Sequence, residues 1–173
     1  MGSRSIMLTV LESKNAPSIF ADPLAWAVAD FVGGLLGETE LASSDRIQTG
    51  LIVVSDLCSL STIRALSAMA KQDFLSPLKF AGASPSIVSG LAALREQIRG
   101  PTVTFTMDPR TSRAAITALI RLWMMFNSVS PVIVVTHLEV PDVGHHLKGR
   151  LLFAPNPNLD SEVDDLCEIV GKC

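Results

Sequence analysis

The sequence predicts an α/β domain with a largely parallel sheet and helices on both of its faces. Gly50–Ser55 reads GLIVVS, a short aliphatic run typical of a buried parallel strand. Thr102–Met107 is β-branched and aromatic, as strands commonly are, and Val132–Val135 is another aliphatic run. Helical patterns separate these runs along the chain, and this alternation favours parallel connections between the strands.

The remaining elements follow from caps, breakers and apolar spacing. Asp22 and Pro23 form a typical helix start, because Asp can cap the helix while Pro occupies its first turn. Gly100 and Pro101 end another helix. Helices are expected at residues 24–36, from 61 or 62 to about 74, at 86–99 and at 111–126, further strands at 6–11 and 149–154, and a loop at 76–86.

The size and composition predict one domain and no membrane span. The chain has 173 residues, of which 48% are hydrophobic, and the mean hydropathy is +0.39. Its apolar runs are far too short to cross a bilayer. The high hydrophobicity therefore indicates deep burial or a surface covered by another chain. We expect a body at residues 1–155 and an acidic tail at 156–173, either solvated or forming a short helix.

Charge and cysteine content exclude other classes. The 14 basic and 17 acidic side chains give a net charge of −3 without a basic cluster, so we expect no nucleic-acid partner. Cys58, Cys167 and Cys173 are too few and too scattered for a disulfide scaffold or a zinc site. The N-terminal residues lack the apolar core of a signal peptide. These features predict a cytoplasmic protein with reduced thiols.

Three places in the sequence hold residues that could act as nucleophiles or metal ligands. Residues 107–112 read MDPRTS, a strand-to-helix turn of the kind that displays nucleophiles, although Ser112 is its first nucleophilic residue. Cys58 also follows a strand, but no base accompanies it in a recognisable motif, so we interpret it as a small buried side chain. His145 and His146, near Asp142 and Glu139, have no further ligand at zinc-like spacing, so no metal is predicted.

Three segments together resemble the N-terminal half of β-ketoacyl synthases, which have the thiolase-like fold. They are Ser76–Phe80 (SPLKF), Ala83–Gly90 (ASPSIVSG) and Arg99–Thr102 (RGPT). The similarity is greatest to ketosynthase and chain-length-factor subunits of type II polyketide systems, and it runs from about residue 45 to residue 139, roughly half of the chain. The resemblance implies half of a thiolase-like fold in a truncated ketosynthase-like chain.

The resemblance also implies that this chain lacks the family's catalytic groups. In the family the Gly-Pro pair opens a strand, and the nucleophilic cysteine follows the proline by eight residues, which here is Pro109. Proline has no nucleophilic side chain to hold an acyl group as a thioester. The family's two catalytic histidines belong to its other half, so their role is not transferred to His137, His145 or His146. We therefore expect no catalysis by this chain alone and no cofactor of its own.

The expected partner is a full-length ketosynthase. The helix at 111–126 is apolar on nearly all sides, a pattern typical of a helix buried all round. In the family this helix lies between two sheets, and the preceding strand pairs across a dimer axis. The resemblance therefore implies that the partner covers both, and that an acyl carrier protein delivers phosphopantetheine-bound substrate. The expected interface and acyl-tunnel wall comprise Thr104, Phe105, Thr106, Met107, Asp108 and Pro109.

Alternative interpretations remain for the charged turn and for the function. Arg110 and Arg113 are expected to contact the carrier's phosphopantetheine or an acidic partner surface, or else are solvated charges at a helix start. The chain could instead be a homodimeric scaffold or regulatory protein. A third alternative is a small acyl-transfer enzyme that uses Cys58 or Ser112 with a histidine.

Overall fold

The computed structural model describes residues 2–14, 18–39, 41, 45–125 and 129–168. Its five-stranded sheet has the order β1-β5-β4-β2-β3. β2 is parallel to β3 and β4, whereas β5 is antiparallel to β4 and β1, so four of the five strands run in the same direction. The strands are β1 (Ser3–Leu8), β2 (Gly50–Ser55), β3 (Thr102–Phe105), β4 (Val132–Val140) and β5 (Gly144–Leu152).

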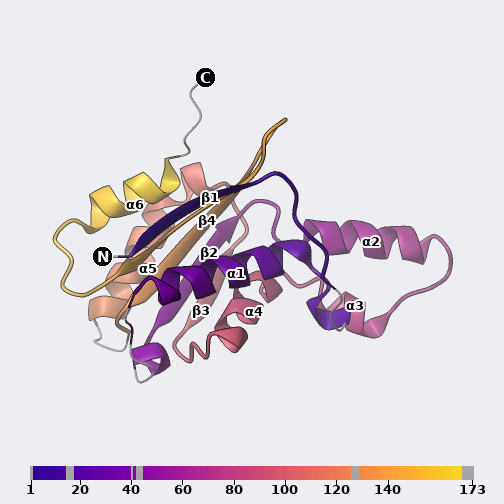
Figure 1. Ribbon diagram of the computed structural model, residues 1–173. Helices are drawn as coiled ribbons and strands as arrows, with labels where there is room; N and C mark the ends of the chain where they lie inside the picture. Colours follow the sequence, from indigo (N-terminus) through magenta and orange to yellow (C-terminus); the bar gives the residue numbers. More distant parts are fainter. Residues whose placement is uncertain (1, 15–17, 40, 42–44, 126–128, 169–173) are drawn as a thin grey trace.

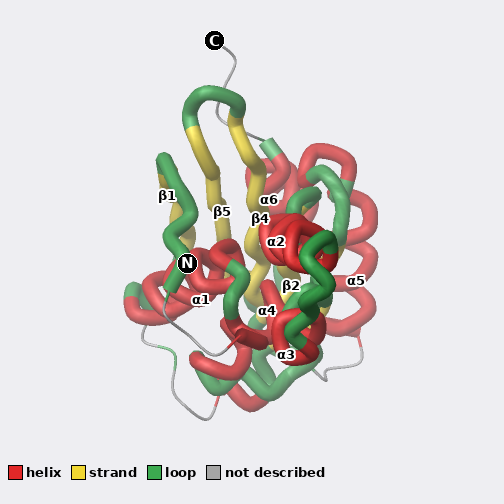
Figure 2. The backbone as a smooth tube through the Cα atoms, turned by 90° about the vertical axis from the view of Figure 1, so that its right-hand side faces the viewer, coloured by secondary structure: helices red, strands yellow, loops and turns green. Residues whose placement is uncertain are grey.

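Helices cover both faces of this sheet, as the sequence predicts (Figures 1 and 2). On one face α1 (Pro23–Gly37) and α4 (Ile87–Arg95) share a core cluster with strand residues such as Val53 and Val135. On the other face α5 (Arg113–Met125) and α6 (Leu159–Cys167) pack against Ile52, Val54 and Val134. The alternating inward positions of β2 and β4 therefore divide the core into two layers.

The loop expected at residues 76–86 contains a short helix, which corrects that prediction. Ser76 caps α3 (Pro77–Ala81) by accepting a hydrogen bond from the backbone N–H of Lys79 at 3.3 Å. α3 and α2 (Leu60–Ala70) form an arm that projects from one end of the sheet (Figure 1). The arm leaves large apolar side chains exposed at Ile63, Phe74, Leu75, Leu78 and Phe80.

β4 and β5 are longer than expected and form one antiparallel hairpin. The sequence predicts only residues 132–135 and 149–154 there, because polar residues such as His137 and Lys148 interrupt the aliphatic runs. In the structure Val132 pairs with Leu152 and the register continues to Val140 opposite Gly144. Pairing with β2 and β1 on the two outer sides makes the whole hairpin part of the sheet.

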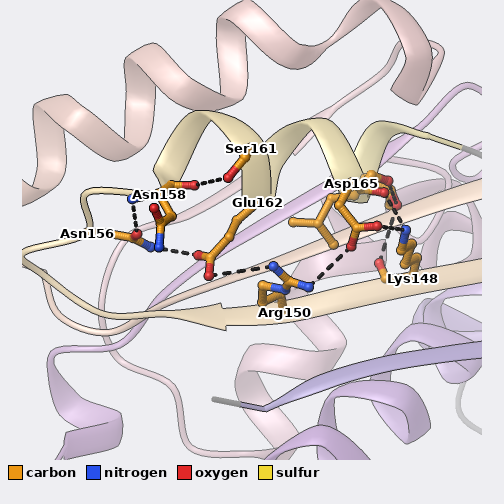
Figure 3. A network of polar contacts seen from close by, with 9 residues as sticks. Lys148, Arg150, Asn156, Asn158, Ser161, Glu162 and Asp165 are labelled. Carbon is orange, nitrogen blue, oxygen red and sulfur yellow. Dashed lines mark hydrogen bonds and ion pairs between the residues drawn. The ribbon is translucent and has the colours of Figure 1, made fainter.

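The acidic tail provides α6, which docks on the body of the chain. Its apolar residues Leu159, Val163 and Leu166 enter the core beside α5. Its acidic residues pair with basic residues of the same chain (Figure 3). Lys148 Nζ lies 2.7 Å from Asp165 Oδ1, Arg150 Nη1 lies 3.6 Å from Glu162 Oε1, and Arg150 Nη2 lies 3.2 Å from Asp165 Oδ2. Further ion pairs of this helix join Arg113 to Asp164 and Arg121 to Asp160. α6 is therefore packed on the rest of the chain as far as Cys167.

Within this chain α5 is buried on one side only, so the cover of its other side by a partner stays a prediction. Ile116, Thr117 and Ile120 face the core. The outward side is formed by Ala114, Ala118, Leu122 and Met125, and Met125 is 68% exposed. α6 packs beside α5 and supplies part of the cover that the sequence analysis assigns to a partner.

Candidate functional site

The first candidate site is β3 and the turn that follows it. Gly100 approaches the backbone of Thr49 so closely that a Cβ atom would overlap the Thr49 carbonyl oxygen, which explains the need for glycine here. Thr104 then bonds through Oγ1 to Ser89 Oγ of α4 at 2.7 Å. Phe105 and Met107 are partly buried against the core under α5. Among the expected interface residues Thr106 is exposed and Pro109 is buried, and the other four are partly exposed.

β3 is the last strand of the sheet and has a free edge. It pairs with β2 alone, and no other strand of the described residues lies beyond it. An edge strand presents unpaired N–H and C=O groups that can extend a sheet into another chain. β3 therefore has the geometry to pair with a partner.

We call Thr106–Ser112 the β3 turn, and its polar groups are satisfied within it. Asp108 accepts the N–H of Arg110 at 2.8 Å and also pairs with the Arg110 guanidinium. Hydrogen bonds from this guanidinium hold the pKa of Asp108 below its usual value. Pro109 is buried in the first position of a short 3-10 helix, and Ser112 Oγ donates to the Pro109 carbonyl at 2.7 Å. The turn therefore exposes no nucleophile.

The structure also locates the other predicted residues of this region. Ser112 is fully buried, and the hydrogen-bond partners described for its side chain are the Pro109 carbonyl and Cys167 Sγ, with no histidine. Arg110 is exposed beside Asp108, and Arg113 pairs with Asp164 of α6. Both predicted anion contacts therefore already have an intramolecular carboxylate.

A second turn, Asp56–Ser59, joins β2 to α2, and we call it the β2 turn. Ser55 Oγ accepts the N–H groups of Leu57 at 3.2 Å and Cys58 at 3.1 Å. Cys58 has a positive φ of 41°, uncommon for a residue with a side chain. It is buried, and its thiol donates to the Ser55 carbonyl. Burial raises the pKa of the Cys58 thiol to about 11, so this thiol is protonated and a poor nucleophile at neutral pH.

A chain of hydrogen bonds begins at Ser55 and ends at His145. Ser55, at the carboxyl end of β2, and His137, within β4, are register partners, and Ser55 Oγ lies 2.8 Å from His137 Nδ1. His137 Nε2 lies 3.1 Å from His145 Nδ1, and the two rings stack with centroids 5.3 Å apart. Burial, and next the nearby His145 and His146, lower the pKa of His137 to about 3. His137 is therefore neutral at physiological pH.

The number of hydrogen-bond partners at Ser55 fixes which group donates and which accepts in these hydrogen bonds. Its oxygen already accepts two backbone N–H groups, so its hydroxyl must donate to His137 Nδ1. Neutral His137 then carries its proton on Nε2 and donates it to His145 Nδ1. The remaining ring nitrogen of His145, Nε2, is left as an N–H donor.

Sequence reasoning missed this cluster because Ser55 and His137 are 82 residues apart. The available signal was that the runs GLIVV and VIVV end in Ser55 and in Thr136-His137. The carboxyl ends of parallel strands meet at one edge of a sheet, which is where such polar residues come together.

Among the described residues, no three or more His, Cys, Asp or Glu side chains are grouped so that they could hold a metal ion. No helix within the same residues is long and apolar enough to cross a membrane.

Comparisons with known proteins identify the fold. No family model matches the sequence, and no curated protein matches it either. The structure is similar to a chain of the ketosynthase (ApeO) in complex with its chain length factor (ApeC) from Xenorhabdus doucetiae. The TM-score is 0.59 and the sequence identity 12%, over 83% of this chain and 63% of that one.

A second similar chain comes from the ishigamide ketosynthase/chain length factor. Here the TM-score is 0.58 and the identity 16%, over 82% of this chain and 44% of the other. The protein therefore has the thiolase-like α/β fold of the chains in ketosynthase–chain length factor complexes, as the resemblance implies. It spans less than two thirds of the length of either chain.

Proposed function

We propose that this chain is a non-catalytic, chain-length-factor-like subunit that pairs with an active β-ketoacyl synthase. The pair would elongate acyl chains on an acyl carrier protein in the cytoplasm, in polyketide biosynthesis. The proposal rests on the ketosynthase-type fold together with the β3 turn, in which Pro109, the residue that the sequence resemblance matches to the family's nucleophile, has no nucleophilic side chain. The catalytic groups would then belong to the partner.

The free edge of β3 supports a protein partner at this position. Pairing along β3 would satisfy its outer backbone groups and bring Thr104, Phe105, Thr106, Met107, Asp108 and Pro109 beside the partner. These residues would form one wall of the acyl tunnel. Arg110 and Arg113 would contact the carrier's phosphopantetheine by exchanging their present carboxylate partners for its phosphate.

The exposed apolar side chains of the arm also support a partner. Phe74, Leu78 and Phe80 are each at least 60% exposed, which is unfavourable in water unless another surface covers them. The outward side of α5 adds Leu122 and Met125.

The experiment is co-expression of the full chain with a tagged ketosynthase encoded beside its gene, followed by co-purification and mass measurement by light scattering. A stable complex with one copy of each chain is the expected result. Phe80→Glu on the arm and Thr106→Arg beside β3 should each weaken co-purification by at least about tenfold, equivalent to about 1.4 kcal/mol. Val143→Glu, an exposed position in the turn between β4 and β5, is the matched control.

The free β3 edge equally favours a second copy of this chain, so the homodimeric scaffold remains the second candidate. A homodimer that ignores the ketosynthase, and that Thr106→Arg converts to monomer, would establish that alternative and exclude the first.

A further inference from the structure

A cavity of about 310 Å³ lies at the end of the hydrogen-bond chain that starts at Ser55. It is bounded by the β4–β5 hairpin, the start of α2, the start of α1 and the segment after β1. His145 and Cys58 both line it, so the β2 turn opens directly onto this space. The cavity is separate from the β3 turn, none of whose residues lines it.

Aliphatic side chains form about half of the cavity wall. Leu11, Leu24, Leu57 and Leu60 line it from three different parts of the chain. Burying methylene and methyl groups away from water is favourable, so a branched hydrocarbon group would be favoured here.

Two opposite charges lie at the rim of the same cavity. Arg64 of α2 and Glu139 of β4 both line it, and both are exposed. Across the described part of the chain, neither side chain forms an ion pair with the other or with a third residue. A ligand that carries both charges could therefore bridge them.

His145 adds an oriented donor next to Glu139. The two residues are directly opposed in the β4–β5 register, so their side chains lie on the same face of the hairpin. Because Ser55 and His137 fix the ring, His145 presents Nε2–H, for which no described residue is a hydrogen-bond partner.

We propose that this cavity binds a small zwitterion with an aliphatic body, namely a branched-chain α-amino acid. Its carboxylate would pair with Arg64 and accept the Nε2–H of His145, its ammonium group would pair with Glu139, and its side chain would contact the leucines. Cys58 serves only as part of the wall. This site does not depend on the proposed pairing with a ketosynthase.

The test is titration of the full chain, in whatever assembly it purifies, with L-leucine by calorimetry and by side-chain ¹⁵N NMR of the histidines. Leucine should bind with a Kd below ~10 mM and shift the His145 Nε2 signal without shifting that of His146. Arg64→Gln and Glu139→Gln should each weaken binding at least about fivefold, whereas Arg99→Gln, an exposed arginine outside the cavity, should leave it within about twofold.

Ligand analogues identify which groups are recognised. 4-Methylpentanoate lacks the ammonium group and 3-methylbutylamine lacks the carboxylate, so each should bind at least about fivefold more weakly than leucine. Equal binding of 4-methylpentanoate would overturn the proposal in favour of a simple carboxylic acid. Absence of any shift with leucine, or equal effects of Arg64→Gln and Arg99→Gln, would overturn it entirely.

Discussion

The β3 turn and the β2 turn follow neighbouring parallel strands, yet their polar groups are satisfied in different ways. In the β3 turn, Asp108 and Arg110 bond to each other and to the backbone within a few residues. In the β2 turn, Ser55 is bonded to His137 on another strand, and His137 to His145 on a third. The comparison teaches that the hydrogen bonds of the β3 turn are formed locally, whereas those of the β2 turn are assembled by the tertiary fold and include the buried His137.

Acid should have the largest effect on stability, through protonation of His137 beside the β2 turn. The folded pKa of His137 is about 3, below its usual 6.5, so the unfolded chain binds a proton there more readily. The contribution of neutral His137 to the free energy of unfolding is fully present above pH 6.5. It is lost as the pH falls toward 3, by up to about 1.4 kcal/mol per pH unit. Urea unfolding at a series of pH values between these two pKa values should show this slope, and His137→Gln should reduce it. An unchanged slope in the variant would contradict the assignment.

Ser55→Ala should have the next largest effect. It removes the acceptor for the Leu57 and Cys58 N–H groups and the donor to His137, all in a buried place. We expect the free energy of unfolding to fall by about 2–4 kcal/mol, because unsatisfied buried groups cost about 1–3 kcal/mol each and partly relax. Chemical denaturation measures this loss. Ser61→Ala, an exposed serine at the rim of the same cavity, is the matched control and should change little.

Asp108→Ala in the β3 turn should lower the free energy of unfolding less than Ser55→Ala does. The change removes one cap of a short helix at a partly exposed position, so a loss of about 1 kcal/mol is expected. Measured under the same conditions as Ser55→Ala, a loss as large as that of the serine variant would show that the two turns do not differ as described.

Pro109→Cys should have almost no effect on catalysis. A thiol at this buried position would still lack an effective base, because His137 is bonded to Ser55 and His145 and its pKa of about 3 makes it a weak base. Mass spectrometry after incubation with an acyl thioester should detect no acylation of the introduced thiol above the level of the native chain. Acylation together with condensation activity by the variant alone would contradict the non-catalytic assignment.

The sequence determined the features that depend on near neighbours. GLIVVS formed a fully buried strand with the expected bounds, and Asp22 capped α1 through the N–H groups of Leu24 and Ala25. The conformation of the β3 turn depends on its neighbouring residues Asp108 and Pro109, since capping and proline geometry act within one turn. The alternation of strands and helices was sufficient to predict the α/β class.

Only the tertiary structure decided the features that join distant segments. The acidic tail became α6 because Arg150 and Lys148 of β5 lie where Glu162 and Asp165 can pair with them (Figure 3). The Ser55–His137–His145 chain exists because strand register brings residues 82 positions apart to adjacent places. Local propensity acts over a few residues, whereas register and docking depend on the burial of whole faces, and a sequence pattern does not specify which faces meet.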